Sequence, residues 1–264
     1  MSQFKDQLGN IIQLDKTPER IVSLVPSQTE LLFDLGLEET VIGITKFCIH
    51  PEQWFRTKTR IGGTKTVDLE KVKKLQPDLI IANKEENVKE QIEALQSIAP
   101  VWTSDINNLH EALQMIQSVG QLTNRIEKAV DIVNNIEVSF NQLPTTNHQL
   151  KTAYLIWKDP YMTVGGDTFI SDMMKRCGFH NVFGDQLRYP EVELNSIKTS
   201  GCKLLLLSSE PYPFKEKHVK ELQEQLPNTK VLLVDGEMFS WYGSRLQLAP
   251  GYFKHLLAQI DSWV

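Results

Sequence analysis

The chain has 264 residues, of which 41% are hydrophobic, and its 28 basic residues against 33 acidic residues give a formal net charge of −5. This length and apolar content suit one large domain or two lobes with real cores. The basic residues are scattered rather than gathered in a stripe that could neutralise phosphates, so we expect no nucleic-acid partner. No segment approaches the ~18 apolar residues of a membrane span.

The first part of the chain, residues 20–102, alternates short β-branched runs with amphipathic stretches. This alternation is typical of βα units on a mainly parallel sheet. We expect strands at Ile21–Val25, Val41–Ile44 and Leu79–Ala82, and helices at Glu30–Leu35 and between Asp68 and Pro77. Pro26–Thr29 is expected to form a turn with a helix N-cap, and the first lobe to close near Val101.

The same order of elements recurs in the second half of the chain. We expect a strand at Thr152–Trp157, a small-residue turn at Gly165–Thr168 and a helix at Phe169–Arg176. A further echo pairs Asp68–Lys73 before Leu79–Ile81 with Glu193–Lys198 before Leu204–Leu206. The repetition predicts a second lobe similar to the first.

A single helix is expected to link the two lobes. Thr123–Phe140 contains no Gly or Pro, and its apolar residues fall on one helical stripe. About 18 residues at ~1.5 Å each give a rod of roughly 27 Å. We therefore predict an α/β protein of two Rossmann-like lobes with mainly parallel sheets, joined by one long rigid backbone helix. The N-terminal lobe would span residues 1–121, the helical linker residues 122–145 and the C-terminal lobe residues 146–264.

Several motifs along the chain carry a family resemblance. They lie at Asp6–Asn10, Thr17–Leu24, Val25–Glu30 and Leu75–Ile80, in this order and spacing. With these motifs the chain resembles the class III substrate-binding proteins of ABC importers, a family that binds cobalamin or iron chelates and has a rigid backbone helix. The resemblance covers nearly the whole chain. It implies a carrier that holds its ligand in a cleft between the lobes and has no catalytic residues.

The resemblance also implies which side chains hold the ligand. A corrin or porphyrin is broad and flat, and aromatic walls bury much of its area while only two torsions fix each ring. The implied contacts in the first lobe are Phe47, His50, Trp54 and Thr64. Those in the second lobe are Tyr161, Tyr189, Phe239, Trp241 and Arg245. All follow predicted strands, where open α/β sheets bind ligands.

The tryptophans are expected to divide into two classes. Trp102 and Trp157 lie within or beside apolar strands and are expected in the core. Trp54 and Trp241 lie in polar loops that offer little core to enter, so a surface or ligand-binding role is expected for them. Ordinary structural roles compete elsewhere: loop packing for Phe239, and a salt bridge or helix cap for Arg245.

His50 departs from the family pattern, because cobalamin binders usually have an aromatic residue there. It could ligate iron or cobalt, donate a hydrogen bond to the rim of a ligand, or be an ordinary loop histidine. Cys48 and His50 form a pair, but two ligands at this spacing make no zinc site, so we expect no protein metal centre. The three cysteines are widely spaced and are expected to be buried free thiols: Cys48, Cys177 and Cys202.

Partners follow from the same resemblance. The family docks on an ABC transporter permease through one acidic residue on each lobe. Glu70 matches the first, whereas Asn195 stands at the second position, with Glu193 and Glu191 nearby. We expect docking through Glu70 and Glu193. The acidic residue of the second lobe is then displaced from its usual position, which Asn195 occupies. The protein is expected to be a monomer.

Two other classes of function compete with this interpretation. An enzyme of two Rossmann-like lobes, such as a chelatase or a nucleotide-sugar transferase, is opposed by the lack of a dinucleotide, phosphate-loop or nucleophile-elbow motif. A carrier of free zinc or manganese is opposed by six isolated histidines. Among chelates cobalamin is favoured, with haem or a ferric siderophore as alternatives. No intrinsic cofactor is expected.

The expected location depends on a leader segment. The first ten residues, Met1–Asn10, have neither a basic region before an apolar stretch nor a small-residue cleavage site. We expect a periplasmic or membrane-surface protein if a leader has been removed, with the cytoplasm as the alternative.

Overall fold

The computed structural model describes residues 2–144 and 149–261. The chain folds into two compact units. Unit 1 takes in the residues up to 106, residues 110–137 and Tyr242–Gln247, and unit 2 takes in the rest. Each unit has its own parallel sheet, so the predicted α/β class is confirmed. The units cross the boundaries of the proposed lobes and linker, and that three-part division stays a prediction.

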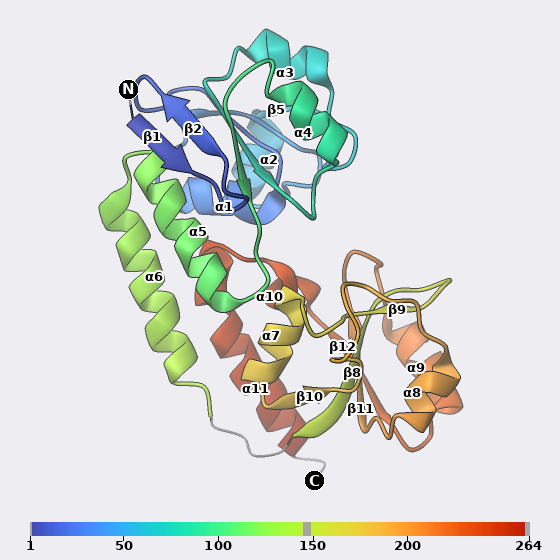
Figure 1. The fold of residues 1–264 in the computed structure, drawn as a ribbon. Coiled ribbons are helices and arrows are strands. Elements are labelled where there is room, and N and C mark those ends of the chain that lie inside the picture. The colour runs from blue at the N-terminus through green and yellow to red at the C-terminus, as the bar shows by residue number, and fades with distance from the viewer. Residues whose placement is uncertain (1, 145–148, 262–264) are drawn as a thin grey trace. The chain divides into compact units, whose positions relative to one another are not determined.

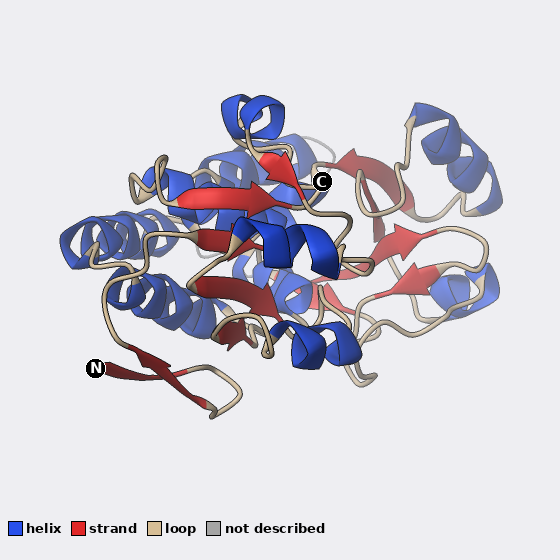
Figure 2. Ribbon diagram, turned by 90° about the horizontal axis from the view of Figure 1, so that it is seen from above, coloured by secondary structure: helices blue, strands red, loops and turns tan. Residues whose placement is uncertain are grey.

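Unit 1 is built on a parallel sheet with strand order β5-β4-β3-β6-β7 (Figure 1). Its strands are β3 (Ile21–Ser23), β4 (Val41–Ile44), β5 (Thr59–Arg60), β6 (Leu79–Asn83) and β7 (Val101–Ser104). The central strands β3 and β6 are buried along their whole length, as apolar strands covered on both faces must be. An antiparallel hairpin of β1 (Ser2–Lys5) and β2 (Ile11–Leu14) forms a two-stranded sheet of its own near the N-terminus (Figure 2).

The helices of unit 1 follow its strands in the order expected for βα units. They are α1 (Pro26–Asp34), α2 (Glu52–Thr57), α3 (Leu69–Leu75), α4 (Lys89–Leu95), most of α5 (Leu109–Leu122) and of α6 (Ile126–Asn141), and the short 3-10 helix η1 (Ser244–Gln247). Helix α1 begins four residues earlier than predicted. The segment expected to form a turn is its first turn, because Pro26 at the first helical position gives up no needed N–H donor.

The predicted linking helix, in contrast, begins later than expected. Residues after Leu122 leave the helix, and Asn124 adopts a left-handed φ of 54° between α5 and α6. Gly120 permits the close approach of these two helices, because a Cβ placed there would lie 2.4 Å from the Cβ of Ala129. The uninterrupted stripe of apolar residues therefore belongs to α6 alone, and the first three residues of the predicted helix form the α5–α6 turn.

Unit 2 has a parallel sheet with strand order β10-β8-β11-β12, and β9 pairs antiparallel with β8. The strands are β8 (Leu150–Trp157), β9 (Met162–Thr163), β10 (Phe179–Asn181), β11 (Leu204–Ser208) and β12 (Lys230–Val234). The helices are α7 (Phe169–Arg176), α8 (Leu194–Thr199), α9 (Glu216–Gln225), α10 (Gly236–Ser240) and α11 (Ala249–Asp261). The predicted helix at residues 169–176 has these bounds.

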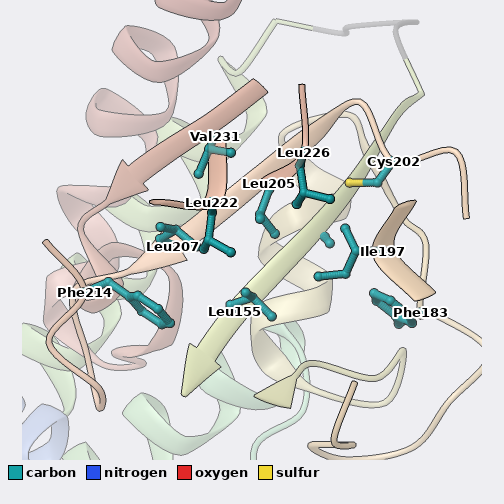
Figure 3. Packing of buried hydrophobic residues seen from close by; sticks show 11 residues of the cluster. Leu155, Phe183, Ile197, Cys202, Leu205, Leu207, Phe214, Leu222, Leu226 and Val231 are labelled. Carbon is teal, nitrogen blue, oxygen red and sulfur yellow. The ribbon is translucent and has the colours of Figure 1, made fainter. Parts of the chain in front are cut away.

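The core of unit 2 fills the space between its sheet and the helices α8 and α9 (Figure 3). Alternate residues of a strand share a face, which places Leu205 and Leu207 of β11 in one row. Ile197 of α8 and Leu222 of α9 pack against this row, together with Phe214 from the loop before α9. The ends of β8 and β11 are thereby fixed, and so are the loops that follow them.

Two other expectations concern the chain as a whole. The three cysteines are buried and free, as predicted: Cys48, Cys177 and Cys202. Within the described residues no helix combines the length and the apolar character needed to cross a membrane.

Candidate ligand-binding site

The loop after β4 in unit 1 presents Phe47 to solvent. Cys48 is buried beneath it, with its Sγ 3.1 Å from the hydroxyl oxygens of Thr29 and of Thr45. Burial raises the pKa of the Cys48 thiol, so the thiol stays neutral and holds the loop through hydrogen bonds. The ring of Phe47 is 50% exposed, and the Lys46 ammonium lies 5.0 Å from its centroid.

The turn after β5 lies against the same aromatic ring. A Cβ placed on Gly63 would be 3.2 Å from Cε2 of Phe47, so the structure brings Phe47 and this turn together. Gly62 has a φ of 105°, which favours glycine. Thr64 is buried, and its carbonyl oxygen accepts a 3.0 Å hydrogen bond from the Asn87 side chain. Thr64 therefore fixes the turn through its backbone.

Trp54 lies in the core of unit 1, and the expectation of a surface position is wrong. Residues 52–57 form the short helix α2 instead of a loop, and Trp54 is its buried residue, only 1% exposed. Its ring packs edge-on against Phe33 of α1 at a centroid distance of 5.4 Å, and the Lys58 ammonium lies 5.2 Å from it. His50 precedes this helix and is half-buried.

Arg245 forms a salt bridge, the structural role that competed with ligand binding in its sequence-based interpretation. The short helix η1 carries Arg245 to α1, where its guanidinium donates two hydrogen bonds of 2.7 Å to the two carboxylate oxygens of Glu30. Gly243 has a φ of 120° and passes close to the backbone of α1, since a Cβ there would be 2.9 Å from the Ser27 carbonyl oxygen. The ion pair of Arg245 and Glu30 joins residues 242–247 to the rest of unit 1.

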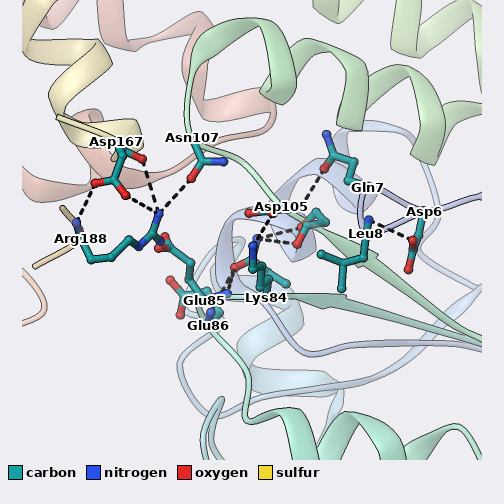
Figure 4. Close-up of polar contacts among 12 residues, drawn as sticks. Asp6, Gln7, Leu8, Lys84, Glu85, Glu86, Asp105, Asn107, Asp167 and Arg188 are labelled. Atoms are coloured by element: carbon teal, nitrogen blue, oxygen red, sulfur yellow. Dashed lines mark hydrogen bonds and ion pairs between the residues drawn. The ribbon is translucent and has the colours of Figure 1, made fainter. Parts of the chain in front are cut away.

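In unit 2, Tyr189 lies beside the guanidinium of Arg188. Figure 4 shows Arg188 with its polar partners Asn107 and Asp167. The Cζ of Arg188 is 5.7 Å from the centroid of the Tyr189 ring. The Arg188 Nη1 donates a 3.1 Å hydrogen bond to Asn107, and its backbone N–H donates a 2.6 Å hydrogen bond to the Asp167 carboxylate. Arg188 has a left-handed φ of 58° that the Asp167 bond holds in place. Tyr189 is half-buried.

Tyr161 lies in the turn between β8 and β9. It follows Asp159, whose φ is 61°, and it is half-buried against the core of Figure 3. Its backbone carbonyl oxygen accepts a 2.9 Å hydrogen bond from the Val192 N–H, three residues after Tyr189. The structure therefore brings the loops of Tyr161 and Tyr189 together within unit 2.

Phe239 and Trp241 are packed inside the protein. Phe239 is fully buried and stacks with Tyr154 and Phe253 at centroid distances of 5.2 and 4.8 Å. Trp241 is only 7% exposed, and its Nε1 donates a 2.8 Å hydrogen bond to Oε1 of Glu210. The expectation of a surface position for Trp241 is therefore wrong, because the half-buried Glu210 carboxylate accepts its indole N–H and lets the ring lie in the interior.

Trp157 was expected in the core, and this expectation is wrong. It is the last residue of β8, directly after the buried run from Ala153 to Ile156, and it is 41% exposed. Trp102, the other tryptophan expected in the core, is fully buried. The turn residues Asp159 and Pro160 that follow Trp157 were the available sequence signal, since they mark the strand end where side chains leave the core.

The two acidic residues expected to dock on a permease occupy similar positions. Glu70 is exposed in the first turn of α3, and Glu193 is exposed at the N-cap of α8. Asp68 caps α3 by accepting a 3.1 Å hydrogen bond from the Lys71 N–H. Asn195 is exposed in the first turn of α8. Within the described residues no cluster of three or more histidine, cysteine or acidic side chains could hold a metal ion.

The sequence matches a family over most of its length. Residues 21–231 match the family of periplasmic binding proteins. The chain belongs to this family. Its members are solute receptors rather than enzymes, which confirms the expectation of a binding protein of an ABC importer with no catalytic role.

The similar proteins are named for different ligands. A vitamin B12-binding protein of Vibrio parahaemolyticus is 25% identical over 205 residues, covering 76% of this chain and 74% of the relative. A periplasmic haem-binding protein of Roseiflexus has a similar structure, with a TM-score of 0.76, 18% identity and coverage of 92% and 98% of the two chains. A siderophore-binding protein bound to acinetobactin and ferric iron gives a TM-score of 0.79, 18% identity and coverage of 97% and 98%. The two structures show the shared fold.

Proposed function

We propose that this periplasmic binding protein carries a cobalamin-type chelate and delivers it to an ABC transporter permease. The observation that carries the proposal is the similarity to vitamin B12-binding protein over 76% of the chain. The proposal places the protein in the periplasm, as a monomer without a nucleic-acid partner.

The accessible aromatic side chains support a broad, flat ligand. Phe47 is exposed, and Tyr161 and Tyr189 are half-buried, each in a segment that follows a strand or its turn. A flat macrocycle gains most from rings whose positions are already fixed, because little side-chain freedom is lost on binding. We propose that these three rings contact the chelate, together with His50 at its rim.

We propose that the buried residues implied by the family resemblance affect ligand binding only indirectly. Thr64 fixes the turn beside Phe47, and Trp54 packs against Phe33 in the core of unit 1. Phe239, Trp241 and Arg245 anchor the segment from α10 to η1 through their own packing and hydrogen bonds. Changing them should alter ligand affinity only through the position of the accessible residues or through stability.

Haem is the second candidate ligand, and His50 favours it. A histidine side chain is a common ligand of haem iron. The half-buried position of His50 and the exposed ring of Phe47, three residues earlier, support this alternative. A ferric siderophore is the third candidate, and it would use the same aromatic rings without an iron ligand from the protein.

An optical titration with cyanocobalamin, haemin and a ferric triscatecholate tests the proposal. We expect cyanocobalamin to bind at micromolar concentration or below and to compete with the other two. Tight binding of haemin with a Soret shift that is lost in His50→Ala would assign haem instead. Binding of none of the three at ~100 μM would overturn the chelate proposal.

Permease docking is a separate part of the proposal. Glu70 and Glu193 are both exposed at the N-terminal ends of helices, where an acidic side chain can meet basic residues of a partner. Replacing both by Gln should leave chelate affinity unchanged and should lower ligand-stimulated ATP hydrolysis by the reconstituted importer. The Lys71→Gln variant, which alters a basic residue next to Glu70, serves as the control.

A further inference from the structure

Each of the four parallel strands of unit 2 has a lysine or a histidine at its start. The strands lie in the order β10-β8-β11-β12, and the four residues, in the same order, are His180, Lys151, Lys203 and Lys230. All four are exposed. They lie far apart in sequence and only the sheet brings them together, so the sequence alone shows no basic cluster. We call these four residues and Lys198 the basic edge.

Backbone contacts fix the spacing of this row. His180 is the partner of Lys151 in the parallel register of β10 and β8. The Lys203 N–H donates a 2.8 Å hydrogen bond to the carbonyl oxygen of Lys151, and the Lys230 N–H donates a 2.9 Å hydrogen bond to that of Lys203. Neighbouring strands lie about 4.8 Å apart, so the row spans roughly 14 Å. The side chains therefore extend from a rigid base.

The turn between α8 and β11 adds a further charge beside the row. Lys198 is exposed in the last turn of α8. A Cβ placed on Gly201 would lie 3.5 Å from the Nζ of Lys151, so the Lys151 ammonium reaches over this turn. A helix C-terminus attracts a cation, which accounts for Lys198 by itself. It does not account for the lysines at the strand starts, so the basic edge is broader than a helix cap.

Carboxylates do not neutralise the centre of the basic edge. Among the residues that the structure describes, Lys151, Lys198 and Lys203 form no ion pair. Lys151 and Lys203 are also neighbours across the pairing of β8 and β11, and like charges on adjacent strands repel each other. The arrangement therefore lowers stability, and the stability of the sheet gives no reason for it.

The same edge of the sheet in unit 1 provides an internal comparison. There the Lys58 ammonium, directly before β5, donates a hydrogen bond to the carbonyl oxygen of the acidic residue Glu38, which precedes β4. Asp78 precedes β6, and its carboxylate accepts hydrogen bonds from the N–H groups of Glu19 and Arg20. Acidic and basic residues are thus mixed at the strand starts of unit 1. The basic edge is a property of unit 2 rather than of this type of sheet.

We propose that the basic edge binds a membrane surface that contains anionic lipid headgroups. Such a surface presents its phosphates in a plane, which matches ammonium groups spread over adjacent strand starts and a helix end. Each lysine close to an anionic membrane is attracted to it. The whole chain has a formal net charge of −5, so an anionic surface repels the protein except where basic residues gather. The contact is therefore confined to this edge.

The basic edge lies at the opposite end of the sheet from the candidate ligand contacts of unit 2. Figure 3 shows both ends of β11: Cys202 comes directly before Lys203, and Phe214 lies in the loop beyond the other end. Tyr161 and Tyr189 follow the C-terminal ends of β8 and β10. A membrane bound at the basic edge would therefore leave the loops of both tyrosines accessible to a ligand.

Sedimentation with lipid vesicles tests this inference on the wild-type protein. One set of vesicles is pure phosphatidylcholine, and the other contains phosphatidylglycerol as about one-third of its lipid. At about 50 mM NaCl we expect at least tenfold stronger binding to the anionic vesicles, and at about 500 mM NaCl we expect this preference to disappear, because salt screens exposed charges. Equal binding to both kinds of vesicle, or binding that salt does not weaken, would overturn the inference.

A triple variant locates the contact on the basic edge. Lys151→Gln, Lys198→Gln and Lys203→Gln together remove three charges and break no ion pair among the described residues. One lysine near an anionic surface strengthens binding about fivefold, so we expect the triple variant to bind anionic vesicles at least about tenfold more weakly than the wild type. Unchanged binding by the triple variant would overturn the inference.

The matched control removes the same charge from unit 1. Lys73→Gln, Lys74→Gln and Lys89→Gln alter three exposed lysines of α3 and α4. The two triple variants have the same net charge, so a difference between them reports where the lysines lie. We expect the control to bind anionic vesicles within about twofold of the wild type. Equal weakening in both variants would show a general charge effect and would overturn the inference.

A soluble anionic polymer is the alternative partner, and inorganic polyphosphate serves as its probe. If the wild type binds polyphosphate through the same three lysines but does not bind anionic vesicles, the membrane contact is overturned and the basic edge is assigned to a polymer. Chelate titration of the triple variant should match that of the wild type, since the altered residues lie at the other end of the sheet. Vesicle binding and chelate binding can therefore fail independently of each other.

Discussion

Arg245 and Glu30 form a bidentate ion pair in unit 1, in which both hydrogen bonds measure 2.7 Å. The two side chains are only 10% and 16% exposed. Removing one partner leaves the other charge poorly solvated, so we expect Arg245→Ala to lower the free energy of unfolding by about 2 to 4 kcal/mol. Denaturant unfolding measures this change. An Arg245→Ala protein with normal stability but weakened chelate binding would contradict the structural role.

The control for this prediction is an ion pair of the same kind at the surface. Lys16 and Glu19 form a salt bridge with side chains 61% and 70% exposed. Exposed pairs contribute little, so Glu19→Gln should change the free energy of unfolding by less than about 1 kcal/mol. The double variant Arg245→Ala with Glu30→Ala should recover part of the loss, since it removes the uncompensated carboxylate as well.

The second prediction tests how much the N–H group of Trp241 contributes to stability, apart from its aromatic ring. Trp241→Phe keeps an aromatic ring but removes the donor to Glu210, whose Oε1 then retains the 2.6 Å hydrogen bond from Ser240. We expect the free energy of unfolding to fall by about 1 to 3 kcal/mol, the scale of a lost hydrogen bond to a charged group. Trp102→Phe is the control, because its lost bond is longer, at 3.3 Å, and goes to the neutral carbonyl of Lys5.

The positions of the tryptophans show where sequence reasoning reaches its limit. The strands were predictable from their β-branched and aliphatic runs, because a strand buried on both faces must be apolar along its length. Polar neighbours alone placed Trp54 and Trp241 at the surface. That reasoning omitted α2, which turns Trp54 toward Phe33, and the Glu210 carboxylate, which accepts the N–H of Trp241.

Trp157 shows the opposite error. Its neighbours on the N-terminal side are apolar, which predicts a core position from sequence, but it is the residue at which the strand leaves the core. The family motifs supplied the remaining candidates, and the structure showed which of them are accessible, such as Phe47 and Tyr189. Long-range partners such as Glu30 for Arg245 lie 215 residues apart in sequence and had no local signal.

The third prediction concerns the stability of unit 2 in acid. His218 is buried, and its Nδ1 accepts a 3.0 Å hydrogen bond from the Lys215 N–H at the start of α9. Burial, followed by the positive charges of Lys217 and Lys158, lowers the pKa of His218, and Glu221 opposes this shift. The unfolded state therefore binds a proton more readily than the folded state. Stability is complete above the unfolded pKa of about 6.5 and falls as the pH drops from there toward the lower folded pKa.

Unfolding experiments at pH 7.5 and pH 5 test this linkage. The wild-type midpoint should fall toward pH 5, and His218→Phe should reduce that fall, because a phenyl ring can replace the imidazole beside Tyr212 and Phe214 but cannot take up a proton. His180→Gln, at an exposed histidine, should keep the wild-type pH dependence. Equal pH dependence of the wild type and His218→Phe would show that other groups determine acid stability.

The last prediction uses two helical glycines with opposite surroundings. A Cβ on Gly120 of α5 would lie 2.4 Å from the Cβ of Ala129 of α6, whereas a Cβ on Gly251 of α11 would meet no atom within 4 Å. Alanine favours a helix over glycine by about 1 kcal/mol, so Gly251→Ala should leave stability unchanged or raise it by up to that amount. Gly120→Ala brings the same propensity gain but forces α5 and α6 apart, and overpacking of this kind costs about 1 to 3 kcal/mol. We therefore expect a lower unfolding midpoint for Gly120→Ala than for Gly251→Ala, and a stabilised Gly120→Ala protein would show that the α5–α6 contact can open without cost.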